Sequence, residues 1–127
     1  MAVVYATSTK TGRMNAVVTD IGASGKVKFY TSNGGTLLAT FALAATAGTV
    51  SGTVLTFSDA NGATAGILNT TAAAAGTATY AEVTTSADVA KITGLTVGTS
   101  GTDFVMDNNV FASGQAITIN SATITHA

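Results

Sequence analysis

The densest group of side chains that could bind a metal ion lies near the C-terminal end of the sequence. Asp103, Asp107, Asn108 and Asn109 place carboxylate and amide oxygens within seven residues, and clustered oxygens of this kind are the ligands of calcium. Their spacing differs from the EF-hand loop, in which acidic or amide residues recur at every second position before a glycine. Aspartate and asparagine also favour turns. We therefore interpret these residues as turn formers and expect no metal site.

Side chains for nucleophilic catalysis are sparse. The sequence has no cysteine and one histidine, His126, in the last residues of the chain, where chains commonly fray. A serine or threonine nucleophile needs a base within hydrogen-bond reach, and His126 is not expected to supply one. The glycine loop Gly98–Gly101 lacks the lysine and the following helix of a phosphate-binding loop. We expect no enzyme activity and no cofactor.

Charge and composition narrow the range of partners. Of 127 residues, five are basic and six are acidic, so the net charge is -1. A net charge this small does not attract nucleic acid or an anionic membrane surface strongly. No apolar run approaches the length of about 20 residues that spans a bilayer. The many small threonine, alanine and glycine side chains lose little entropy when buried between subunits. We expect neither nucleic acid nor a membrane as partner.

One segment has a helical period. Met14, Val17, Val18 and Ile21 recur at the spacing of one helix face. Glycine is favoured just past a helix end, so the helix is expected to start between positions 9 and 12 and to stop at position 22 or 25. Residues 1–8 then form a possible N-terminal arm, and residues 9–24 form the helix and a linker.

The remainder of the chain alternates between apolar and polar residues, with glycine or Asn/Asp turns between the alternating segments, which is typical of strands. A loop over 47–49 is expected to separate two of these strands. The expected strands cover Lys26–Thr31, Thr36–Leu43, Val50–Ser58, a short piece at Ile67 and Leu68, Thr77–Thr84, Val89–Val97, Phe104–Asp107 and the chain from Gln115 onward.

The last strand contains a change of parity. Ile117 and Ile119 point to one side of a regular strand, whereas Ala122 and Ile124 point to the other. A β-bulge or bend near Asn120 or Ser121 would bring both pairs to the core.

About eight strands with tight turns and a single helix favour an all-β fold over a parallel α/β sheet, which needs repeated crossover helices. The sequence predicts one domain over 1–127: an antiparallel β-sandwich, jelly-roll-like, with one short N-terminal helix. The apolar segment Ala2–Tyr5 precedes the helix. It can close the protein's own sheet or add to a neighbour's sheet edge. Val3, Val4 and Tyr5 are therefore the candidate partner interface.

Three stretches carry a resemblance to a known group of proteins. They are Gly76–Val83, Val97–Asp103 and Ala112–His126, and together with Arg13–Val18, Lys26–Thr31 and Leu37–Thr40 the chain resembles small β-rich head proteins of tailed bacteriophages. The resemblance implies a structural virion protein, a capsid decoration or cement subunit that bridges and stabilises major capsid proteins.

The same resemblance implies a dimer or trimer on the capsid exterior of the virion, assembled in the host cytoplasm. A phage tail, fibre or neck component, acting as an adhesin or assembly protein, is the alternative. Such an adhesin is expected to expose aromatic residues.

Overall fold

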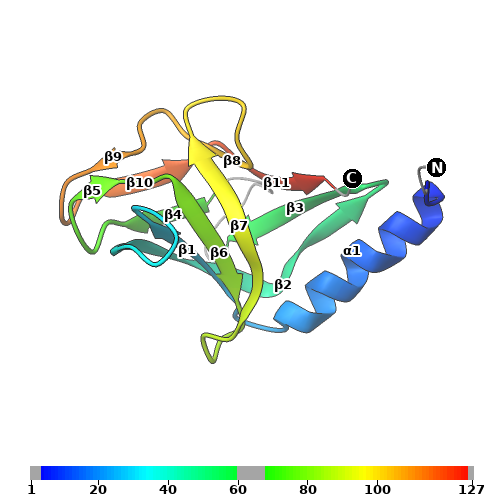
Figure 1. Cartoon of the computed structure of the whole chain (residues 1–127). Coiled ribbons are helices and arrows are strands. Elements are labelled where there is room, and N and C mark those ends of the chain that lie inside the picture. The colour runs from blue at the N-terminus through cyan, green and yellow to red at the C-terminus, as the bar shows by residue number, and fades with distance from the viewer. Residues whose placement is uncertain (1–3, 60–67, 126–127) are drawn as a thin grey trace.

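The computed structural model describes residues 4–59 and 68–125. The described residues form one helix and eleven strands, drawn in Figure 1. Their bounds are α1 Thr7–Ile21, β1 Lys26–Tyr30, β2 Leu37–Ser51, β3 Val54–Asp59, β4 Leu68–Thr71, β5 Gly76–Thr77, β6 Tyr80–Thr84, β7 Ala90–Gly98, β8 Phe104–Val105, β9 Val110–Phe111, β10 Ala116–Ile119 and β11 Ser121–Thr125.

The predicted helix is confirmed as α1. It begins at Thr7, two residues before the expected range, because the backbone N–H groups of Thr9 and Lys10 both donate to the carbonyl of Ala6 and close an additional turn. Met14 and Ile21 are buried on the face that the spacing predicts. The helix ends at Gly22, whose φ of 72° is favoured by glycine.

Seven strands close into a barrel in the order β1-β2-β3-β11-β8-β7-β6, with β6 pairing back onto β1. Every pair in this barrel is antiparallel except β7 with β8, which is parallel. The predicted antiparallel sandwich of the jelly-roll type is therefore wrong. Alternation shows that one face of each strand is buried, and a barrel and a sandwich satisfy that pattern equally.

Four phenylalanine rings form a cluster inside the barrel. Phe29, Phe41, Phe57 and Phe104 have no solvent-exposed area. The ring centroids of Phe29 and Phe41 lie 4.8 Å apart, and Phe104 lies 5.5 Å from Phe29 and 5.9 Å from Phe57. These tilted ring pairs come from four different strands, so one cluster ties the two sides of the barrel together.

Strand β2 is longer than predicted, and the expected loop over 47–49 is wrong. The first part of β2 pairs with β1 and its last part with β3, and the register shifts between Leu43 and Gly48. A Cβ atom on Gly48 would collide with the backbone carbonyl of Thr56. Gly48 therefore allows β2 and β3 to approach each other closely and does not form a turn. The chain reverses at Gly52 instead.

The predicted break in the last strand is confirmed. Asn120 lies outside any strand and separates β10 from β11. β10 pairs with β4 in a small second sheet, whereas β11 pairs with β3 and β8 in the barrel. Ile117, Ile119 and Ala122 are all buried as a result.

The remaining strands agree only in part with those predicted from the sequence. Leu68 begins β4, whereas Ile67 lies outside the described residues. The expected strand over Thr77–Thr84 is divided into β5 and β6. Strand β9 was not expected at all, and it pairs with β5 to form a third, two-stranded sheet.

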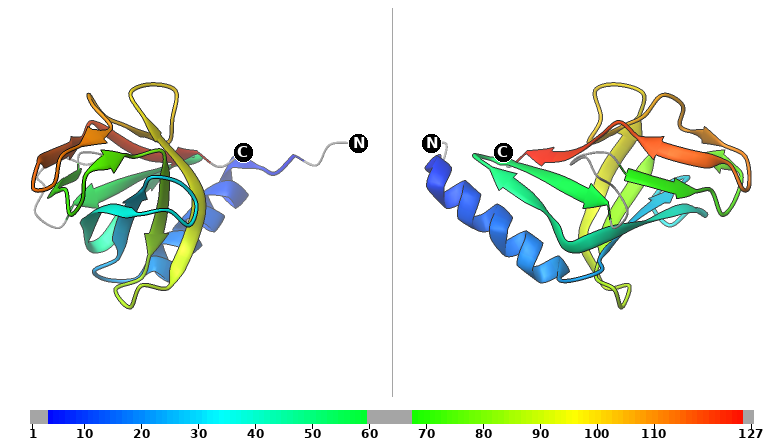
Figure 2. Two further views of the ribbon diagram at one scale, coloured as in Figure 1. Left: turned by 60° about the vertical axis from the view of Figure 1, so that its left-hand side comes forward. Right: turned by 180° about the vertical axis from the view of Figure 1, so that it is seen from behind.

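The molecule has two distinct ends. The start of α1, the β2–β3 turn and the end of β11 lie at one end, and β5, β9 and the start of β10 lie at the other (Figure 1). Viewed from a second direction, residues 4–6 extend away from the barrel (Figure 2). Helix α1 packs mainly against β2.

Candidate functional site

The oxygen-bearing side chains near the C-terminus are used in separate structural contacts. The Asp103 carboxylate accepts hydrogen bonds from the backbone N–H and the hydroxyl of Thr96, at 3.0 and 3.2 Å. Thr96 in turn accepts one from the Asp103 N–H at 3.1 Å. This closed set of bonds holds the connection between the parallel strands β7 and β8.

The other members of this group point to different partners. Asp107 accepts a hydrogen bond from the Asn120 amide at 2.7 Å, Asn108 accepts one from the Val110 N–H at 3.0 Å, and Asn109 donates to the Ala78 carbonyl at 2.7 Å. Within residues 4–59 and 68–125, no three acidic or histidine side chains converge as metal ligands. His126 lies outside the described residues.

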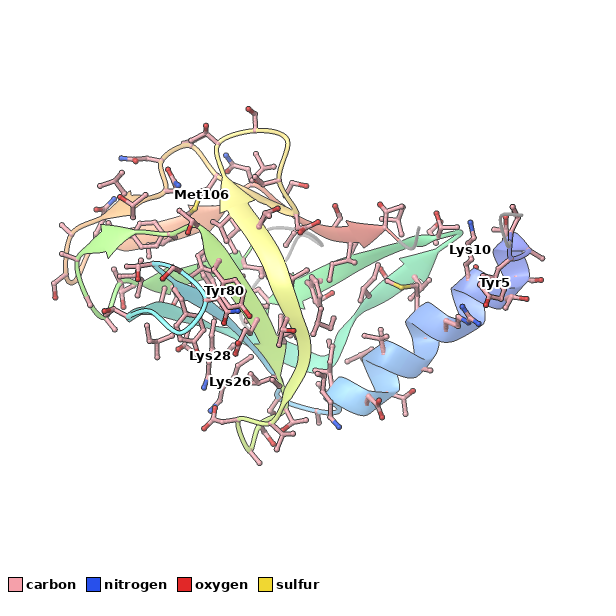
Figure 3. The ribbon with its side chains drawn as sticks, in the orientation of Figure 1. Tyr5, Lys10, Lys26, Lys28, Tyr80 and Met106 are labelled. Carbon is pink, nitrogen blue, oxygen red and sulfur yellow. The ribbon has the colours of Figure 1, made fainter. Side chains whose placement is uncertain are left out.

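Two lysines on the outer face of β1 share one carboxylate. The Lys26 and Lys28 ammonium groups lie 2.9 and 2.8 Å from Asp88, which sits in the β6–β7 turn. Hydrogen bonds from Lys28 and then Lys26 lower the pKa of Asp88 from 3.8 to about 2. The two positive charges are thereby satisfied within the fold, and Figure 3 shows both lysines on the same side of the barrel.

Tyrosines continue this outer face. Tyr30 and Tyr80 are paired across β1 and β6, with ring centroids 6.1 Å apart. The Tyr80 hydroxyl donates to Glu82 at 3.1 Å and accepts from the Gly94 N–H at 3.3 Å. Both tyrosine residues are half-buried on this face.

The predicted partner interface lies at the start of α1. Val3 is outside the described residues. Val4 is 84% exposed and Tyr5 is 41% exposed, and neither belongs to a strand of the barrel. The guanidinium of Arg13 lies over the Tyr5 ring, 3.9 Å from its centroid. The barrel closes without Val4 and Tyr5, so these two residues do not complete the protein's own sheet.

The helix that carries this segment is attached to the barrel near its N-terminal end. The Thr11 hydroxyl contacts the carbonyl of Gly52 in the β2–β3 turn and also that of Thr7. Further along, Met14 and Ile21 are buried against the barrel. The exposed segment therefore starts from a fixed point at one end of the molecule.

A pocket of about 230 Å³ lies at the opposite end. Its apolar floor consists of Met106, Phe111 and Ile117, each at most 4% exposed. Asp107, Asn108, Gln115, Ala116 and Thr118 surround it. In Figure 3, Met106, one of the residues that line this pocket, lies far from Tyr5.

This pocket was not predicted from the sequence. The stretch between β8 and β10 was interpreted as turns, because Asp107, Asn108 and Asn109 dominate it. The available signal was Phe111, a large apolar residue between polar turn residues. In the structure its side chain is buried beneath the loop.

Comparisons with models of protein families, with curated proteins and with solved structures return no match. Among the residues that the structure describes, no helix combines the length and the apolar character needed to cross a membrane.

Proposed function

We propose that this chain is a non-enzymatic structural protein of a tailed-phage particle. It is a dimer or trimer that decorates the capsid exterior as a cement subunit and that bridges and stabilises major capsid proteins. Its assembly takes place in the host cytoplasm. Val3, Val4 and Tyr5 are the proposed partner contact. The sequence resemblance over Gly76–Val83, Val97–Asp103 and Ala112–His126 supports the assignment to phage heads.

One structural observation carries the proposal of an assembly role. An apolar segment, with Val4 84% exposed, stands outside the barrel on a helix that is bonded to the barrel through Thr11. Exposed apolar residues at a fixed position are typical of protein–protein contacts. Several charged side chains already form contacts within the fold, which favours an apolar contact with the partner. They are Lys26, Lys28, Asp88 and Asp103.

The direct test is binding to phage heads that lack this chain. Heads from a phage deleted for the gene are mixed with purified protein, and bound copies are counted by quantitative gel. We expect saturation at hundreds of copies per head, together with heads that resist higher temperatures before releasing DNA. Failure to bind, or binding without any gain in head stability, would contradict the cement role.

Variants of the same protein connect binding to the proposed contact. Val4→Asp is expected to reduce head binding, because it puts a charge into the apolar contact. Ser8→Asp is the matched control, since it adds the same charge to exposed helix surface two residues past Ala6. Equal binding by both variants would remove the segment from the interface.

Copy number in intact particles separates the proposal from its alternative. A tail, fibre or neck component is present in few copies per particle, whereas a cement protein covers the whole head. A few copies per purified virion would favour the alternative and contradict decoration.

A further inference from the structure

The pocket follows the edge of strand β10. It borders each of the consecutive residues 115–118, although side chains of successive strand residues point to opposite faces. A pocket that touches all four residues therefore lies along the strand's edge rather than on one of its faces. We call this pocket, with its floor of Met106, Phe111 and Ile117, the β10 slot.

The backbone groups of β10 alternate between its two edges. The Ala72 N–H donates to the Gln115 carbonyl at 2.8 Å, so residue 115 directs its carbonyl toward the β4 side. In an antiparallel pair the backbone groups of every second residue bond to the same neighbouring strand. The backbone groups of Ile117 and Ile119 therefore bond to β4. The N–H and C=O groups of Ala116 and Thr118 consequently face the β10 slot.

A further hydrogen bond agrees with this alternation. The Asn120 N–H, which has the same parity as Ala116 and Thr118, donates to the Val105 carbonyl at 2.8 Å. After Val105 the next strand is β9, which pairs with β5 and not with β10. Among the described residues β10 pairs with β4 alone. The slot therefore lies where a further strand would pair with β10, and it presents the backbone groups of Ala116 and Thr118 to that strand.

The segment suited to this place is at the other end of the molecule. Ala2–Tyr5 is a run of four apolar residues, Val4 is exposed, and the backbone of Ala6 is extended, with φ -60° and ψ 150°. Residues 4–6 point away from the barrel in Figure 2, and β10 lies at the far end of the molecule in Figure 1. The described part of the segment therefore does not approach the chain's own β10.

The charges of the two ends are complementary. Lys10 and Arg13 lie beside the segment, and neither forms an ion pair with a described residue. Asp107 lies on the rim of the β10 slot, is exposed, and forms no ion pair within residues 4–59 and 68–125. Joining the ends would place two cations near one carboxylate.

We propose that the β10 slot receives the N-terminal segment Ala2–Tyr5 of a second copy of this chain as an added β-strand. Backbone groups of Ala116 and Thr118 bond to the incoming strand, and one valine side chain of the segment packs on the apolar floor. Because the segment and the slot are different surfaces, the contact is head-to-tail, and it produces a ring or an open chain of copies. This inference rests on the segment that we propose as the partner contact, and it identifies that partner as a neighbouring copy of this chain. It does not depend on the assignment to phage heads, because copies can associate in this way without a head.

The test uses two full-length variants that each disable one side. Val4→Asp damages the segment and leaves the slot intact. Ala116→Pro removes an N–H that faces the slot, and proline is tolerated where a strand's N–H has no ladder partner. Ser8→Asp and Ala116→Ser are the matched controls, because they alter the same regions without touching the valine or the N–H.

Self-association is measured by sedimentation equilibrium over a range of concentrations. We expect the wild type and both controls to associate, and each disabled variant to associate at least about tenfold more weakly. For Ala116→Pro this is the change that corresponds to one lost hydrogen bond, and for Val4→Asp it reflects a charge brought against the apolar floor. An equimolar mixture of the two disabled variants should form a 1:1 heterodimer, because one intact segment meets one intact slot.

Several results would overturn the proposal. A wild type that stays monomeric at millimolar concentration would do so, as would disabled variants that associate like the wild type, or a mixture that fails to pair. If Ala116→Pro does not melt like the wild type, Asp107→Asn replaces it, since that change removes the rim charge and keeps a side-chain oxygen that accepts the hydrogen bond from Asn120. Unchanged association of Asp107→Asn would then count against the slot.

Discussion

Two glycines show how the same residue type serves opposite purposes in this chain. Gly48 lies where a Cβ atom would strike the backbone of β3, whereas Gly12 is inside α1 with open space around it. Gly48→Ala is expected to lower the free energy of unfolding by about 1–3 kcal/mol, since the strands must separate. Gly12→Ala is expected to raise it by about 0.5–1 kcal/mol, because alanine loses less backbone entropy in a helix.

Urea unfolding of both variants checks this pair of expectations. A Gly48→Ala variant as stable as the wild type would show that β2 and β3 do not approach each other as closely as described.

Asp88 is expected to make the stability depend on acid pH. Its pKa is about 2 in the folded protein, against an ordinary value of 3.8, because Lys28 and Lys26 bond to the carboxylate. A lowered folded pKa means that the stabilisation is present above 3.8 and is lost as the pH falls through about 2. The carboxylate is exposed to solvent, so the effect is small and decreases with salt.

Melting temperatures of the wild type and Asp88→Asn between neutral pH and pH 2 measure this effect. The wild type should melt higher above pH 3.8, and the two curves should converge toward about pH 2. Parallel curves over the whole range would contradict the shared ion pair of Lys26 and Lys28.

At the scale of elements, hydrogen exchange tests the alternation of β10. In dilute solution the amides of Ile117 and Ile119 should exchange slowly, because they bond to β4, and those of Ala116 and Thr118 should exchange fast. Raising the protein concentration should slow Ala116 and Thr118 specifically, as incoming segments occupy the slot. Equal protection of all four amides in dilute solution would contradict the pairing described for β10.

The sequence predicted individual elements better than their partners. Helix α1 and the break at Asn120 could be predicted because each depends on local spacing: the helical period of Met14 to Ile21, and the parity change after Ile119. Gly48 was misjudged because glycine favours turns and close strand contacts alike, and only the position of Thr56 distinguishes the two.

Strand partners depend on contacts between distant parts of the chain. The alternation of β1 gives it one buried face, but nothing in Lys26–Tyr30 shows that it pairs with β6, a strand that begins only at Tyr80. The parallel pairing of β7 with β8 is equally invisible, because its short connection depends on the bonds between Asp103 and Thr96. Barrel closure therefore could not be predicted. The lining residues of the β10 slot all lie within 106–118, but which edge of β10 stays open depends on its pairing with the distant strand β4, so the slot could not be predicted either.

At the scale of the whole molecule, the closed barrel separates two different ends. One end presents Val4 and Tyr5 beside Lys10 and Arg13, and the other presents the β10 slot with Asp107 on its rim. The phenylalanine cluster lies inside the barrel between them. A small body of this kind, with contacts at both ends, suits a protein that acts by occupying repeated positions on a larger assembly.

A density map of the intact phage particle tests the central claim, that this chain is a structural subunit on the capsid exterior, most directly. The account predicts barrel-shaped density in many copies on the outer surface of the head, in contact with the major capsid protein. Density for the chain confined to the neck, tail or fibres, or a head surface without it, would contradict the claim.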